Sequence, residues 1–122
     1  MNFPTKMYID GALTNGSATR DVINPATDTL VATVAVAGAD DAERALQSAK
    51  ATFPIWAAMP IAERQAWMRK LRDAVVEAED WLRTCVHHEM GKPWAQTEED
   101  WGRLVASLDY YAEEIARLRD YG

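Results

Sequence analysis

The stretch "ADDAERALQSAKATF" at residues 39–53 marks the point where the sequence changes from β-like to helical periodicity. Four apolar residues recur there at spacings that place them on one face of a helix: Ala42, Leu46, Ala49 and Phe53. Asp40, with Glu43 after it, is typical of a capping box, so we expect the helix to begin at Asp40. Pro54 predicts that this helix stops or restarts as a short turn.

Residues 1–38, upstream of this stretch, carry the signals of two small β-hairpins. Asp-Gly is a strong two-residue turn signal, because both central positions of a type I′ turn need a positive φ. Asn before Pro opens a turn, since the Asn side chain bonds its own backbone. The turn pairs are Asp10-Gly11, Asn15-Gly16 and Asn24-Pro25. The residues that then favour a strand are Val31, Thr33, Val34 and Val36.

Residues 54–122 carry three further amphipathic patterns. Pro60 suits the first position of a second helix, Asp80 is placed to cap a third, and Gly91 followed by Pro93 predicts the end of that helix and the start of a fourth. The second stripe is Trp67, Met68, Leu71, Val75 and Ala78; the third is Leu82, Cys85 and Val86; the fourth is Trp101, Leu104, Val105, Leu108, Ala112, Ile115 and Leu118. The five tryptophans could suggest a stacking platform, but most sit at stripe positions, so we predict that they belong to the core: Trp56, Trp67, Trp81, Trp94 and Trp101. The fold class is therefore α+β: β-hairpins at 1–38, then about four amphipathic helices at 39–122.

Composition narrows the class of protein. A chain of 122 residues with 48% hydrophobic and 26% charged residues suits one ordinary globular domain. A net charge of −6 repels phosphate backbones and anionic lipids, so we expect neither nucleic-acid nor membrane partners. Cys85 is the only cysteine and the N-terminus lacks the apolar core of a signal peptide, which predicts a cytoplasmic location.

The segment "HHEMGKPW" at residues 87–94 raises the question of a metal or phosphate site. Adjacent helical residues point roughly 100° apart, so His87 and His88 cannot chelate one ion on one face, and we interpret them as solvated. A phosphate-binding loop needs a second Gly five residues before Gly91 and a Ser or Thr after Lys92, and neither is present.

Two further candidates have plainer interpretations. Cys85 lies in an apolar stripe, where cysteines are usually inert packing rather than nucleophiles. Glu98, Glu99 and Asp100 form an acidic cluster near a helix start, where negative charge is favourable, and a cation site is the minority interpretation. The residues alone therefore indicate no self-contained active site.

Several motifs in order resemble the N-terminus of the aldehyde dehydrogenase superfamily: "NPAT", "FPIW", "ER", "EMGKP" and "YYAEE". The resemblance covers nearly the whole chain, and "EMGKP" is most similar to the succinate-semialdehyde dehydrogenase branch. Asp28 stands where the family often has Gly, which implies an altered hairpin tip.

The resemblance implies that residues 1–122 are the N-terminal portion of a Rossmann-like α/β cofactor domain, with the catalytic domain absent. The family oxidises an aldehyde to a carboxylic acid with NAD or NADP, through a cysteine thiolate and a glutamate-activated water. The family's catalytic and cofactor-binding residues lie downstream of this segment, and neither Cys85 nor Lys92 matches their motifs. We therefore expect no catalytic or cofactor-binding residue here and no cofactor on this chain alone.

The resemblance also implies partners and one metal ligand. The partners are the rest of the polypeptide, a small aldehyde, and further copies in a homo-oligomer. Asp100 matches an acidic position that in some relatives helps to hold a monovalent cation, together with backbone carbonyls near Ile23.

Two other hypotheses stay open. A truncated product would be a stand-alone helical scaffold that binds a partner without catalysis. The third is a small metal-binding protein built around His87, His88 and the acidic cluster. If the chain is instead the N-terminal part of an aldehyde dehydrogenase, its apolar stripes have no sheet to cover here. We then expect an exposed apolar patch, marginal stability or self-association.

Overall fold

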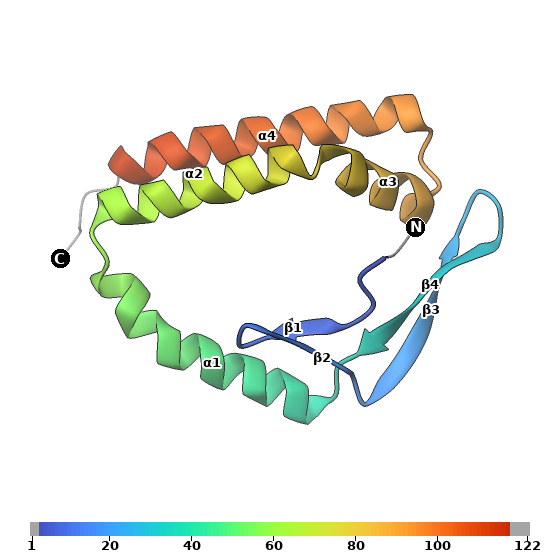
Figure 1. Cartoon of the computed structure of the whole chain (residues 1–122), viewed down its shortest axis with the longest axis horizontal. Helices are drawn as coiled ribbons and strands as arrows, with labels where there is room; N and C mark the ends of the chain where they lie inside the picture. Colours follow the sequence, from blue (N-terminus) through green and yellow to red (C-terminus); the bar gives the residue numbers. More distant parts are fainter. Residues whose placement is uncertain (1–2, 118–122) are drawn as a thin grey trace. The chain divides into compact units, whose positions relative to one another are not determined.

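The computed structural model describes residues 3–117 (Figure 1). Leu118, assigned above to the last apolar stripe, lies outside these residues. The chain forms two compact units, the first made of Met1–Ala57 with His88–Gly91 and the second of Ala58–His87 with Lys92–Gly122. The strands and helices occur in the expected order, which confirms the α+β class.

The first unit contains the two predicted hairpins. Its strands are β1 (Met7–Ile9) with β2 (Ala12–Thr14) and β3 (Ala18–Asn24) with β4 (Thr29–Val36), both pairs antiparallel. Asp10 and Gly11 have φ values of +52° and +76°, as a type I′ turn requires. Buried Asn24 accepts the Ala26 N–H through Oδ1 at 2.9 Å, which confirms the turn inferred from Asn-Pro. Asp28 takes a φ of +55°, so the hairpin tip keeps the left-handed residue for which glycine is favoured.

Asn15-Gly16 forms a connection rather than a hairpin turn, because β2 and β3 belong to different sheets. Gly16 instead permits a close backbone approach. A Cβ at this position would lie 2.2 Å from the carbonyl oxygen of Val36, so a side chain cannot be accommodated without moving the end of β4.

Helix α1 (Ala39–Ala58) begins one residue before the predicted cap and runs past the predicted stop. The capping box at Asp40 and Glu43 is wrong: the Gly38 N–H donates to Asp41 Oδ2 at 2.9 Å, so the carboxylate one residue later ties the helix start. Pro54 lies inside the helix, and the predicted stop there is wrong. Proline removes a single N–H, so only one bond of the last turns is lost.

The second unit contains most of the remaining helical elements. These are α2 (Ile61–Glu77), α3 (Glu79–Met90, whose last three residues belong to the first unit), η1 (Trp94–Gln96), α4 (Thr97–Glu114) and η2 (Ile115–Arg117). Pro60 precedes α2 rather than opening it, and its carbonyl accepts from the N–H groups of Glu63 and Arg64. Asp80 does not cap α3, because the helix already begins at Glu79.

The end of α3 is as predicted, but the start of the next element is not. Gly91 follows Met90 with a φ of +64°, the left-handed conformation expected of a helix-ending glycine. Pro93 then precedes the short η1 turn, and α4 begins only at Thr97.

Helices α2 and α4 lie side by side and antiparallel (Figure 1). Gln65 donates to the carbonyl oxygen of Ala112 at 3.0 Å, and the ion pair between Arg72 and Asp109 joins the same helices at 2.8 Å. A third link, from Arg69 to Glu113, is exposed on both sides. Polar contacts therefore fix the register of this pair.

The core is far smaller than the stripes predict. Within residues 3–117, Ala112 is the buried apolar residue, and Asn24 and Thr97 are the buried polar ones. The expectation of core tryptophans is wrong for Trp56, Trp67, Trp81 and Trp94, which are 38–51% exposed. The helices carry the apolar residues of the predicted stripes, but within each unit few other side chains pack over them. No helix of the described residues is long and apolar enough to cross a membrane.

Candidate functional site

Three of the candidate residues of the sequence, His87, Lys92 and Asp100, lie close together where α3 leads into α4. We call this region the Lys92 corner and define it by six residues of the second unit: Arg83, His87, Lys92, Trp94, Thr97 and Asp100. Lys92 Nζ donates to Asp100 Oδ2 at 2.6 Å, and both side chains are partly shielded, at 25% and 40% exposure. A donor–acceptor distance this short is typical of a charge-assisted hydrogen bond.

The backbone of Lys92 is fixed as firmly as its side chain. His87 Nδ1 donates to the Lys92 carbonyl oxygen at 2.5 Å; a carbonyl only accepts, so this contact places the imidazole proton on Nδ1. Gly91 before Lys92 takes its left-handed φ, and Pro93 after it has a φ of −54°. The interpretation of His87 and His88 as solvated is wrong, since both are half-buried.

Arg83 binds the other side of the corner. Its Nε donates to Thr97 Oγ1 at 3.0 Å, its guanidinium pairs with Glu79 at 2.9 Å, and its Cζ lies 4.6 Å from the ring centre of Trp94. Thr97 is only 1% exposed and donates in turn to the carbonyl oxygen of Trp94 at 2.7 Å. The start of α4 is therefore tied by one buried hydroxyl.

Sequence reasoning missed Arg83 and Thr97. The pattern held a signal for the first, because Arg83 follows Glu79 at the spacing of a helical ion pair. Thr97 was hidden by the expectation that Pro93 opens the helix. Because α4 begins at Thr97, this buried threonine lies at the helix start, where its hydroxyl bonds the preceding turn.

The metal-ligand candidates are not brought together. Within residues 3–117 no group of three or more His, Cys, Asp or Glu side chains could hold an ion. Glu99 pairs with Arg103, and Asp100 with Lys92. Cys85 is half-buried in α3 rather than at the centre of a core. The assignment of a monovalent cation to Asp100 stays a prediction.

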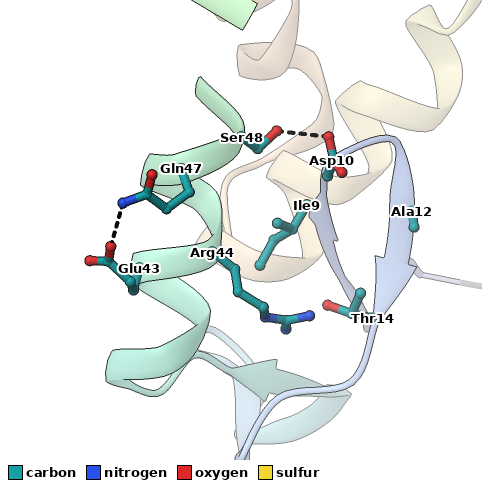
Figure 2. A pocket seen from close by; sticks show the side chains of 8 residues that line it. All are labelled: Ile9, Asp10, Ala12, Thr14, Glu43, Arg44, Gln47 and Ser48. Carbon is teal, nitrogen blue, oxygen red and sulfur yellow. Dashed lines mark hydrogen bonds between the residues drawn. The ribbon is translucent and has the colours of Figure 1, made fainter. Parts of the chain in front are cut away.

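The first unit contains a separate open pocket of about 450 Å³ between the first hairpin and α1. Figure 2 shows its lining: Ile9, Asp10, Ala12, Thr14, Glu43, Arg44, Gln47 and Ser48. Ser48 donates to Asp10 Oδ1 at 2.9 Å, which ties the hairpin turn to the helix. Arg44 is already paired with Asp41 at 2.6 Å, and Gln47 donates to Glu43, so these polar side chains of the pocket wall are engaged within α1.

One carboxyl at the start of α1 has a shifted pKa. The backbone N–H of Gly38 and then the guanidinium of Arg44 hold the pKa of Asp41 below its usual value of 3.8. These two bonds favour the charged carboxylate that accepts the Gly38 N–H at the start of α1.

Comparison with known proteins places these features in a family context. The model of the aldehyde dehydrogenase family matches residues 13–121. Lactaldehyde dehydrogenase of Escherichia coli strain K12 is 33% identical over 113 residues, which are 91% of this chain and 24% of that protein.

Solved structures agree with the sequence match. The structure of PnpE in complex with nicotinamide adenine dinucleotide has a TM-score of 0.90 and 28% identity over 96% of this chain and 25% of that one. Succinate-semialdehyde dehydrogenase from Burkholderia pseudomallei has a TM-score of 0.85 and 30% identity over 90% of this chain and 23% of that one. The chain thus spans about a quarter of the length of these proteins. The similar identities do not single out the succinate-semialdehyde branch, which stays a prediction.

Proposed function

Because this chain belongs to the aldehyde dehydrogenase family, we propose that it is the N-terminal part of the cofactor domain of an NAD(P)-dependent aldehyde dehydrogenase. The whole protein would oxidise an aldehyde to a carboxylic acid, with the nicotinamide as the hydride acceptor. The observation that carries the proposal is a backbone match of TM-score 0.90, over 96% of the chain, to a protein described in complex with nicotinamide adenine dinucleotide.

The role assigned to these residues is structural. Helix α1 has no buried residue, and four of its large apolar side chains are 40–69% exposed: Leu46, Phe53, Ile55 and Trp56. Burying a large apolar side chain contributes about 1.5–3 kcal/mol, so these side chains favour association with further polypeptide. The remaining chain of the enzyme is the proposed partner. The nucleophile, the general base and the cofactor-binding groups are assigned to that remainder, and a cytoplasmic homo-oligomer is the proposed form of the whole protein.

The test begins with the natural polypeptide. An antibody against this chain would capture the protein from source cells, and mass spectrometry would give its size against 13.6 kDa. The captured protein is then assayed for reduction of NAD and NADP with lactaldehyde and succinate semialdehyde, the aldehydes in the names of its relatives. We expect a much heavier polypeptide that reduces one cofactor with an aldehyde. The 122-residue chain, assayed alone as a control, should reduce neither.

The alternative is a stand-alone scaffold that binds a partner, and the exposed apolar side chains of α1 are the observation that favours it. A natural product of 13.6 kDa without dehydrogenase activity would overturn the enzyme proposal and support this one.

A further inference from the structure

We propose that the ammonium of Lys92 is the permanent counter-ion of Asp100, and that it takes the place of a bound monovalent metal ion at that carboxylate. The resemblance implied a cation held with the help of Asp100. The geometry of the corner supplies a cation from the chain itself, with Nζ at 2.6 Å from Oδ2. The inference concerns one side-chain pair and does not depend on the proposed enzymatic activity.

The chemistry of the ammonium suits this replacement. A lysine ammonium is a compact single positive charge with three donors and no acceptor, so it offers a carboxylate the same charge as a sodium or potassium ion. It also adds a directional hydrogen bond, which a metal ion does not. A second ion at the same carboxylate would have to displace this bond or approach an already neutralised pair.

The chain delivers the ammonium from a fixed position. The Lys92 backbone lies between the left-handed Gly91 and Pro93, and its carbonyl oxygen takes the bond from His87 at 2.5 Å. With the backbone held, the side chain loses less freedom on pairing than a mobile surface lysine does. A tethered charge also has a local concentration that does not depend on the salt in solution.

Other charges near the pair are engaged elsewhere. Glu99 pairs with Arg103 one turn along α4, and Arg83 is committed to Glu79 and Thr97. Asp100 therefore has Lys92 as its cationic partner in the second unit, and Lys92 is only 25% exposed. This shielding makes the ammonium a useful reporter, because reagents reach it less readily when it is paired.

The test measures how fast individual lysines of the 122-residue protein are acylated, with mass spectrometry of peptides as the readout. The acylation rate of Lys92 should be lower than that of Lys50, an exposed lysine of α1 that is not part of the Lys92 corner. Asp100→Asn should raise the Lys92 rate roughly two- to fivefold, the range that a partly exposed ion pair supports, and leave the Lys50 rate unchanged.

The decisive comparison is between salts at equal concentration. Under the proposal, the Lys92 rate and the melting temperature are the same in potassium, sodium and tetramethylammonium chloride. If potassium or sodium raises the Lys92 rate above that in tetramethylammonium, and Asp100→Asn removes the difference, a metal ion displaces the ammonium and the proposal is overturned. Acylation of Lys92 as fast as that of Lys50 in the unsubstituted protein overturns it as well.

Discussion

Replacing Gly91 by alanine tests a position that is constrained both by its backbone conformation and by its neighbours. Gly91 has a φ of +64°, and a left-handed conformation costs an ordinary residue about 1–2 kcal/mol. A Cβ there would lie 2.9 Å from both the Cβ and the backbone N of Ala26, and 3.1 Å from Pro25 Cγ. Overpacking of this kind costs typically 1–3 kcal/mol.

One effect acts in the opposite direction, and its size decides the sign. Alanine restricts the unfolded chain more than glycine does, which stabilises by about 0.4–1 kcal/mol. The two penalties together exceed this gain, so Gly91→Ala should lower the free energy of unfolding by about 1–5 kcal/mol. Gly102→Ala is the matched control: Gly102 lies inside α4, and a Cβ there meets nothing within 4 Å. That variant should gain about 0.5–1 kcal/mol.

The assay is urea denaturation monitored by circular dichroism. Both the midpoint and the dependence of the unfolding free energy on urea concentration are compared between variants. We expect a lower midpoint for Gly91→Ala, a higher one for Gly102→Ala, and similar slopes. A Gly91→Ala protein as stable as the original would refute the close approach between Gly91 and the β3–β4 turn. Equal losses in both variants would refute the distinction between the two sites.

Three further predictions address the corner, the helix start and the exposed face. Thr97→Val removes a hydroxyl that is 1% exposed and makes two hydrogen bonds, so it should destabilise by about 1–3 kcal/mol in the same urea assay, whereas Thr97→Ser should recover most of the loss. The pKa of Asp41 is lowered in the folded state, so its stabilisation is present above the unfolded value of 3.8 and is lost as the pH falls through the folded value. The stability difference between the original chain and Asp41→Asn should therefore shrink on acidification, and a difference independent of pH would contradict the bond from Gly38. Phe53→Gln with Ile55→Gln should reduce dye binding and self-association of the isolated chain without lowering its melting temperature, because both side chains are 68–69% exposed; a lower melting temperature would mean that they pack inside the chain.

Local signals in the sequence predicted the turns and the order of elements well. Asp-Gly and the glycine after α3 demand positive φ, and few other residues meet that demand. Helix starts were predicted less well because acidic residues are common there: Asp40, Asp41 and Glu43 all lie in one turn, and only the fold shows which carboxylate meets Gly38.

Burial and the corner were harder to predict for different reasons. An apolar stripe tells which face of a helix avoids water but not what covers it, so Trp67 was placed in a core and is 51% exposed. Asp100 was chosen as a site residue, but its partner was missed. Lys92 and Asp100 are eight residues apart across a helix break, and no helical spacing rule connects them.

The division of the chain bears on how such proteins can be recombined. The first compact unit includes His88–Gly91, which follow α2 in the sequence. The chain therefore changes from one unit to the other three times along its length. A chimera joined after residue 57 would separate the β3–β4 turn from the glycine against which it fits. An exchange between relatives that kept residues 88–91 together with residues 1–57 would preserve that fit. Contiguity in the sequence is therefore a poor guide to where this protein can be divided. Residues 88–91 should be exchanged together with the hairpins and not with the rest of α3.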